Sequence, residues 1–179
     1  MFEVEIMQKR PMDGEYKEIN FGVACDLVWV LFRDQNYDEW VGKFDKGNTF
    51  NKKIEVMNNK ECLLLANGYL YIIEMEKQKI IKQFENTDIY SFIISKDHMK
   101  IITEDCQKIM VYDFEGTFLY RTDVFSLDGI VLVEISGKEV IGNYNDASEE
   151  WGTFIYNYME NTIKYNWEIN ENRPTTGST

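Results

Sequence analysis

The sequence contains one histidine and three cysteines, too few for the side-chain sets behind most familiar enzyme chemistry. His98 stands in a short polar turn, and no serine occupies a Gly-x-Ser-x-Gly elbow, so no nucleophile has an evident base beside it. The glycines at 137, 142 and 152 are isolated and form no phosphate-binding loop. We therefore expect neither a catalytic residue nor a cofactor, and do not expect an enzyme.

Residues with metal-ligand spacing are equally scarce. Cys25, Cys62 and Cys106 lack Cys-x-x-Cys spacing, and with a single histidine they cannot complete a familiar structural zinc site. The stretch with Asp34, Asp38 and Glu39 lacks the regular Asp/Asn alternation and the central glycine of a calcium loop. We expect no metal, and interpret the cysteines as reduced, mostly buried thiols.

Basic side chains and long apolar runs are also in short supply. Against 31 Asp and Glu there are 19 Lys and Arg, a formal charge of -12, which repels nucleic acid phosphates and anionic lipid and attracts a basic partner. The first residues include Glu3 and Glu5 and lack the apolar segment of a secretory signal. With no apolar stretch of bilayer length, we expect a cytoplasmic protein that binds neither nucleic acid nor membrane.

What the sequence has in abundance is strand-forming residues. Aromatic residues reach 15%, and short β-branched and aromatic runs alternate with Gly, Asn, Asp and Ser, as in successive hairpins. Helical periodicity is almost absent. The pattern predicts a single all-β domain over residues 1–170, followed by a flexible polar tail over 171–179.

The hairpins fall into repeated four-stranded antiparallel units. Three units are well defined, with strands expected at 54–57, 61–66, 69–74 and 79–85; at 89–95, 99–103, 108–113 and 117–122; and at 131–135, 139–144, 151–158 and 162–169. A less regular copy begins near Lys17, with middle strands at 26–32 and 39–44, and a strand at 2–7 is a candidate to close the last sheet.

The second strands of the four copies begin at residues 26, 61, 99 and 139, about 35, 38 and 40 residues apart. This spacing is close to that of propeller blades and predicts a propeller-like fold of about four imperfect blades. A β-sandwich or a meandering barrel is the alternative, because hairpins of similar length give a similar spacing without radial symmetry.

The connections at one end of these units are rich in acidic residues. In an antiparallel four-stranded unit, the loop between the second and third strands emerges at the same end as the connection to the next unit. Two of these loops lead directly into a tryptophan. The partner-binding residues expected on this face are Asp34, Tyr37, Asp38, Glu39, Trp40, Glu104, Asp105, Asp123, Asp128, Asp146, Glu149, Glu150 and Trp151.

Carboxylates beside large aromatic side chains are typical of a surface that binds a cationic protein. Charge steers the encounter, and the aromatic residues supply the buried anchors of the interface. A plainer interpretation is that the acids are ordinary solvated loop residues and that both tryptophans begin strands and fill the core.

With its size, its acidity, its missing catalytic set and its loops Asp38-Glu39-Trp40 and Glu149-Glu150-Trp151, the chain resembles in type the small acidic all-β immunity proteins of bacterial polymorphic toxin systems, especially contact-dependent growth inhibition. The resemblance spans most of residues 17–169. It implies an inhibitor that covers the active site of a cognate basic toxin domain, such as an EndoU-type ribonuclease. There are two alternatives. One is a propeller-like interaction scaffold, and the other is a small carbohydrate-binding or carbohydrate-active protein with Trp40 or Trp151 as its sugar platform.

Overall fold

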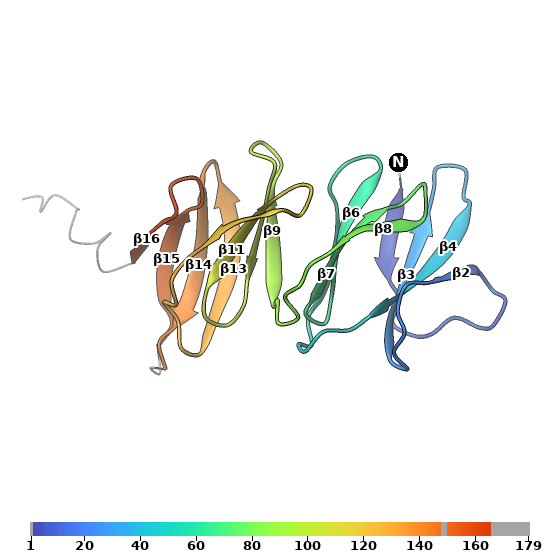
Figure 1. Cartoon of the computed structure of the whole chain (residues 1–179), viewed down its shortest axis with the longest axis horizontal. Coiled ribbons are helices and arrows are strands. Elements are labelled where there is room, and N and C mark those ends of the chain that lie inside the picture. Colours follow the sequence, from blue (N-terminus) through green and yellow to red (C-terminus); the bar gives the residue numbers. More distant parts are fainter. Residues whose placement is uncertain (1, 148–149, 166–179) are drawn as a thin grey trace, which may run out of the picture. The chain divides into compact units, whose positions relative to one another are not determined.

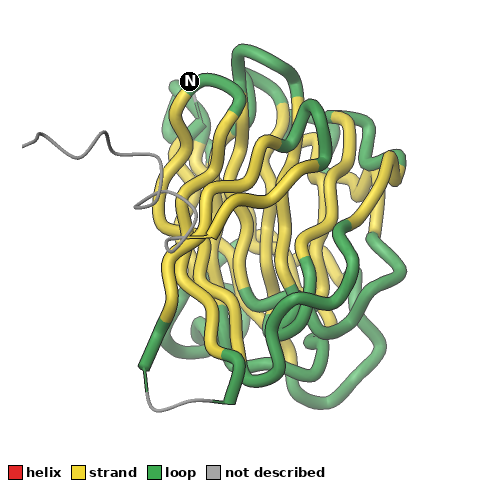
Figure 2. Tube along the Cα trace, turned by 90° about the vertical axis from the view of Figure 1, so that its left-hand side faces the viewer, coloured by secondary structure: helices red, strands yellow, loops and turns green. Residues whose placement is uncertain are grey.

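The computed structural model describes residues 2–147 and 150–165, and every regular element in this part of the chain is a β-strand (Figures 1 and 2). Sixteen strands form four four-stranded sheets. The all-β prediction and the four repeated units are thereby confirmed. Among these residues no sheet closes on itself, so the meandering-barrel alternative is wrong. The described residues include no helix long and apolar enough to span a membrane.

The chain divides into two compact units, Met1–Ser91 (unit 1) and Phe92–Thr179 (unit 2). The strands of unit 1 are β1 (Glu3–Ile6), β2 (Lys17–Asn20), β3 (Leu27–Arg33), β4 (Glu39–Asp45), β5 (Lys52–Val56), β6 (Glu61–Ala66), β7 (Tyr69–Glu74) and β8 (Lys79–Gln83). Those that follow are β9 (Ser91–Ser95), β10 (Lys100–Glu104), β11 (Ile109–Asp113), β12 (Phe118–Arg121), β13 (Gly129–Ser136), β14 (Glu139–Asn145), β15 (Gly152–Asn157) and β16 (Thr162–Tyr165). The polar tail predicted over 171–179 lies outside the described residues.

The first sheet has the order β1-β3-β4-β2 and differs from the simple meander predicted from the sequence. Strand β1 pairs antiparallel with β3, so the N-terminal strand completes the first sheet, and its expected role in closing the last sheet is wrong. The pairing is favoured at one end by Arg33, whose guanidinium binds Glu3 at 3.2 Å and Glu39 at 2.6 Å. Strand β2 pairs parallel with β4, which makes this sheet mixed rather than antiparallel.

The second sheet of unit 1 is the expected antiparallel meander, β5-β6-β7-β8. Its central hairpin turns at Asn67 and Gly68, both with positive φ (53° and 113°), which matches the Asn-Gly signal for a tight two-residue turn. A side chain at Gly68 would place its Cβ 2.1 Å from the carbonyl oxygen of Thr87. Glycine is therefore required here by both the backbone angle and the close approach of another segment.

The core of unit 1 lies between its two sheets. Alternate residues of β3, β4, β6 and β7 point into it, and Phe32 stacks on Trp40 with ring centroids 3.9 Å apart. Cys62 is fully buried there, and desolvation raises the pKa of its thiol to about 12. Cys25 and Cys106 are exposed, so the expectation of mostly buried thiols is correct for one cysteine and wrong for two.

Unit 2 contains two antiparallel meanders, with sheet orders β12-β11-β10-β9 and β13-β14-β15-β16 (Figure 1). The core between them is rich in aromatic side chains, including Phe154, Tyr156 and Tyr158, none of which is exposed. Strand β13 carries a bulge between Leu132 and Glu134 against β14. Together the two sheets fix the ends of β10, β12, β13 and β14, where the candidate acidic loops lie.

Candidate partner-binding site

The connection between β12 and β13 joins two loops at one end of unit 2. The backbone N–H of Phe125 donates to the carbonyl of Gln107, 3.1 Å away in the β10–β11 loop. The N–H groups of Leu127 and Asp128 both donate to the carbonyl of Asn145, at 3.0 and 3.1 Å, where β14 ends. Three segments far apart in sequence thus form one hydrogen-bonded surface.

Ser126 anchors this connection. Its side chain is 1% exposed, and its Oγ accepts a hydrogen bond from the N–H of Gly129 at 3.1 Å. The same oxygen lies 2.7 Å from the carbonyl oxygen of Gly129 and 2.6 Å from that of Asn145, so the single hydroxyl proton is shared between two acceptors. A buried hydroxyl with partners on both sides holds the connection in one conformation.

Five of the predicted carboxylates gather on this surface. Asp123, Asp128, Asp146 and Glu150 are exposed, whereas Asp105 is partly buried because its Oδ1 accepts the N–H groups of residues 107 and 108, at 2.8 and 2.9 Å. Asp105 therefore shapes its own turn, and its other oxygen lies 3.9 Å from the Lys108 ammonium, which offsets part of its charge. We call this surface the acidic end of unit 2; its members are Asp105, Asp123, Asp128, Asp146, Glu150 and Trp151.

Trp151 provides a large apolar surface among these carboxylates. It immediately precedes β15, and 51% of its surface is exposed. Its indole lies against the backbone of Gly129, where an added Cβ would stand 3.1 Å from the ring carbon Cη2. Gly129 has φ of +145°, a conformation that side chains rarely adopt. The absence of a side chain at this position leaves room for the ring, which the structure holds in place with about half of its surface open to solvent.

Apolar residues that the sequence analysis did not single out extend this surface. Val124 and Leu127, in the connection between β12 and β13, are 55% and 64% exposed. A recess of about 290 Å³ lies beside Val124 and Asp123 and is lined in part by Phe125 and Tyr165. The available signal was three large apolar side chains, Val124, Phe125 and Leu127, in a short connection between two strands. An exposed apolar group next to a recess suits the insertion of a partner side chain.

Two residues predicted for this surface, Glu104 and Glu149, are not among its members. Glu104 is only 2% exposed, because it is the last residue of β10 and pairs with Ile109 on β11. The structure thus places it inside unit 2, and we remove it from the candidate surface. Glu149 lies outside the described residues.

In unit 1, the β3–β4 loop is built around the carboxylate of Asp34. Its Oδ1 accepts the backbone N–H groups of Asn36 and Asp38, at 2.7 and 3.0 Å, an arrangement that closes a tight turn. Tyr37 stands at the tip with φ of 65° and 82% of its surface exposed. The loop presents Tyr37 and Asp38 to solvent, while the Asp34 carboxylate is committed to the turn.

Trp40 does not belong to any surface. Strand β4 begins at Glu39, so Trp40 is its second residue and points inward, where it is 3% exposed and stacks on Phe32. Glu39 itself is held by the Arg33 guanidinium at 2.6 Å. The expectation that Trp40 anchors a partner or carries a sugar is therefore wrong, and the core interpretation is correct for this residue.

The expectation of one common acidic face also fails within unit 1. The chain leaving β4 lies beside the β6–β7 turn, since the N–H groups of Gly47 and Thr49 donate to Ala66 and Asn67, at 3.1 and 2.7 Å. The β3–β4 loop sits at the opposite end of β4 and therefore away from that turn. The prediction assumed another strand after β4; instead β2, which precedes β3, takes the outer place by pairing parallel with β4.

A second polar cluster in unit 2 involves the single histidine. The hydroxyl of Tyr158 donates to the carbonyl of Gly137 at 2.6 Å, which leaves its oxygen to accept from both Ser95 and the Nδ1–H of His98, each 2.8 Å away. Ser95 Oγ also lies 3.3 Å from the same His98 nitrogen, so the three side chains form one hydrogen-bonded cluster. The cluster ties the β9–β10 and β13–β14 turns to the end of β15.

Comparison with known proteins adds little to the geometry. No protein-family model and no curated protein matches this sequence. A solved structure with similarity is the crystal structure of the extracellular domain of the putative one component system BT4673 from B. thetaiotaomicron, at 20% identity and a TM-score of 0.48. The match covers 80% of this chain and 21% of that one, so this chain spans about a fifth of its length.

Proposed function

We propose that this chain binds a basic protein through the acidic end of unit 2, and that it acts as an immunity protein that neutralises a cognate toxin domain. The observation that carries the proposal is the connection between β12 and β13, which is hydrogen-bonded to both neighbouring loops and so brings five carboxylates and Trp151 to one end of unit 2. The resemblance in type to immunity proteins supplies the class of partner. The cytoplasmic location expected from the sequence is part of the same proposal.

Electrostatics favour a basic partner over other macromolecules. The formal charge of -12 gives the whole chain a long-range attraction for cations, and the acidic end concentrates carboxylates where a partner would dock. A nuclease binds the phosphate backbone with Lys and Arg side chains, so its active-site channel offers the complementary charge. Carboxylates placed over that channel would occupy the positions of RNA phosphates, as for an EndoU-type ribonuclease.

Affinity requires more than charge, and Trp151 together with Val124 and Leu127 can provide it. Tightly bound interfaces concentrate their energy in a few large side chains that are surrounded by polar groups and lose their water on binding. Trp151 is held against Gly129 before any partner arrives, so little conformational entropy is lost when it is buried. The proposed order of events is electrostatic steering followed by burial of this apolar group.

The proposal is tested with two charge-reversal variants of equal net charge. The first replaces Asp123, Asp128 and Glu150 with Lys at the acidic end, and we expect it to lose the partner. The second replaces exposed acids of the β9–β10, β11–β12 and β13–β14 hairpins, at the other end of the unit 2 strands, and we expect it to keep the partner. These control positions are Asp97, Glu115 and Glu139.

Each variant carries a formal charge of -6 in place of -12, because each reversal adds two charges. A change in general acidity therefore affects both equally. Affinity capture with the wild type should recover a single basic protein that is toxic when expressed alone and harmless when co-expressed with this chain. Recovery of several unrelated proteins would favour the scaffold alternative, and equal capture by both variants would remove the acidic end from consideration.

A further inference from the structure

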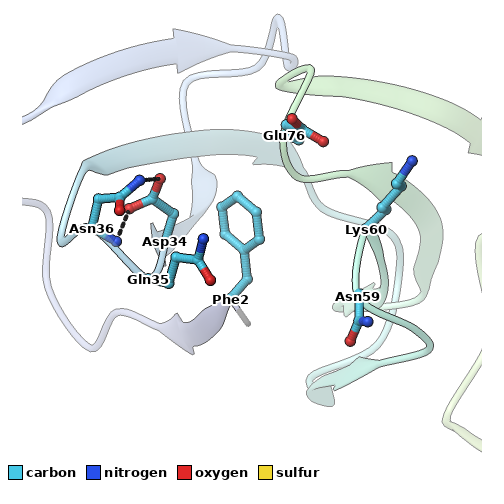
Figure 3. A pocket seen from close by; sticks show the side chains of 7 residues that line it. All are labelled: Phe2, Asp34, Gln35, Asn36, Asn59, Lys60 and Glu76. Atoms are coloured by element: carbon cyan, nitrogen blue, oxygen red, sulfur yellow. Dashed lines mark hydrogen bonds between the residues drawn. The ribbon is translucent and has the colours of Figure 1, made fainter.

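A groove in unit 1 has no part in the proposed contact with a basic protein. It lies where the β3–β4 loop, the β5–β6 turn and the β7–β8 turn meet, beside the ring of Phe2, and has a volume of about 520 Å³ (Figure 3). Sites for small molecules usually have volumes of roughly 300–1,000 Å³. The groove is therefore large enough for a small ligand, although it is open and mainly lined by polar side chains.

The walls of this groove are held in place by residues that do not need a ligand. Asp34 closes the β3–β4 loop through two backbone N–H groups. Asn58 does the same for the β5–β6 turn, with its Oδ1 accepting the N–H groups of Lys60 and Glu61, at 2.9 and 3.0 Å. Glu74 pairs with Lys77 of the β7–β8 turn and with Lys79 at the start of β8, at 2.7 and 3.1 Å. Three turns that are already rigid lower the cost of ordering a binding site.

Other polar side chains on the same turns form no hydrogen bonds or ion pairs within the described part of the protein. Gln35, Asn59, Lys60 and Glu76 line the groove, and their side chains make no hydrogen bond or ion pair with any other described residue. Figure 3 shows Gln35 next to the Phe2 ring on one side, with Asn59, Lys60 and Glu76 on the turns across from it. Two amides, an ammonium and a carboxylate thus surround one aromatic ring.

We propose that this groove binds a neutral carbohydrate. Sugar hydroxyls both donate and accept hydrogen bonds, and they match amides, which do the same, and a carboxylate and an ammonium, which supply one role each. The apolar C–H side of a sugar ring would contact Phe2. A phosphate-bearing ligand is disfavoured, because Lys60 is the one basic residue in a lining that also holds two carboxylates, Asp34 and Glu76.

An extended peptide is a poorer fit to the same groove. Peptides that join a sheet need a free strand edge, and their main chain bonds to the edge backbone. The edge strands of the two sheets that flank the groove, β1 and β5, contact each other instead. The polar groups on offer therefore belong to turn side chains, which suits a ligand recognised through its hydroxyls.

The test uses the full chain and a panel of neutral trisaccharides: maltotriose, cellotriose, xylotriose, mannotriose and N-acetylchitotriose. Saturation-transfer NMR identifies binders, and titration gives dissociation constants. The groove variant carries Gln35→Ala and Asn59→Ala. The matched control carries Gln8→Ala and Asn20→Ala, exposed amides outside the groove lining. Circular dichroism verifies that both variants fold.

We expect at least one trisaccharide to bind the wild type and the control equally, and to bind the groove variant at least tenfold more weakly. Absence of binding across the panel would overturn the proposal, as would equal binding by the groove variant. Binding of an uncharged tetrapeptide at the groove in place of any sugar would overturn it in favour of a peptide site. Neither double variant changes a charge, so failure here is separate from failure of the acidic end.

Discussion

Replacing Tyr158 with Phe should destabilise unit 2 by about 2 kcal/mol. The hydroxyl is buried and contacts His98 and Ser95 at 2.8 Å each and the carbonyl of Gly137 at 2.6 Å. A hydrogen bond contributes roughly 0.5–1.5 kcal/mol net, so three give at most about 4.5 kcal/mol. Part of this is recovered, because Ser95 and His98 already lie 3.3 Å apart and can pair with each other, and Gly137 is exposed and can bind water.

Tyr156→Phe is the matched control for this substitution. The Tyr156 hydroxyl donates one hydrogen bond, 2.8 Å to the Oδ1 of Asn161, which is itself exposed and can turn to water. We expect this variant to lose no more than about 1 kcal/mol, the usual net value of one hydrogen bond. Both substitutions remove one oxygen from a buried tyrosine near the same end of β15, so cavity and propensity effects are alike.

Hydrogen exchange measured by mass spectrometry assigns the effect to unit 2, whatever unit 1 does. Amides of β14 and β15 that exchange through opening of this unit should exchange about 25- to 30-fold faster in Tyr158→Phe, since each 1.4 kcal/mol is tenfold. In Tyr156→Phe they should accelerate by no more than about fivefold. Equal acceleration in the two variants would refute the view that the Tyr158 cluster ties these turns together.

Three further predictions concern other parts of the chain. Because burial raises the pKa of Cys62 to about 12, Ellman's reagent at pH 8 should titrate two thiols in the folded protein and the third only in urea; immediate reaction of all three would contradict its burial. Gly129→Ala should cost about 1–3 kcal/mol and shift the fluorescence of Trp151, because the new Cβ meets the indole at a positive φ; an unchanged emission spectrum would count against the contact. Hydrogen bonds from two lysines lower the pKa of Glu74, so the stability it contributes is present at neutral pH and is lost as the pH falls through that lowered value; Glu74→Gln should flatten this part of the decline in urea midpoints between pH 7 and 3, and an unchanged slope would show the pairing to be inconsequential.

The strands from β5 to β15 could be predicted from the sequence because short local patterns of residues specify them. Each strand is a short apolar run bounded by turn residues, and the Asn67-Gly68 turn has the two positive φ angles that its residue types favour. The strand order of the first sheet could not be predicted in the same way. Pairing of β1 with β3 and parallel pairing of β2 with β4 join segments separated by long irregular connections, and no local pattern encodes such a choice.

The two tryptophans show how little separates a core residue from a surface residue. Both follow a pair of acidic residues, and the sequence gives no reason to treat them differently. Strand β4 begins one residue before Trp40, which sends its side chain into the core, whereas β15 begins one residue after Trp151. Because strand residues alternate between faces, a boundary shift of one or two positions decides burial, and such boundaries are the least certain part of any sequence-based prediction.

The most direct test of the proposed function is the association rate of this chain with the captured basic protein as a function of salt. For the wild type and the Asp97, Glu115 and Glu139 control variant, we expect the rate constant to fall at least about tenfold between low and high ionic strength, as electrostatic steering requires. The Asp123, Asp128 and Glu150 reversal variant should associate slowly at every salt concentration. Identical salt dependence in all three proteins, or an association insensitive to salt, would contradict binding through the acidic end of unit 2.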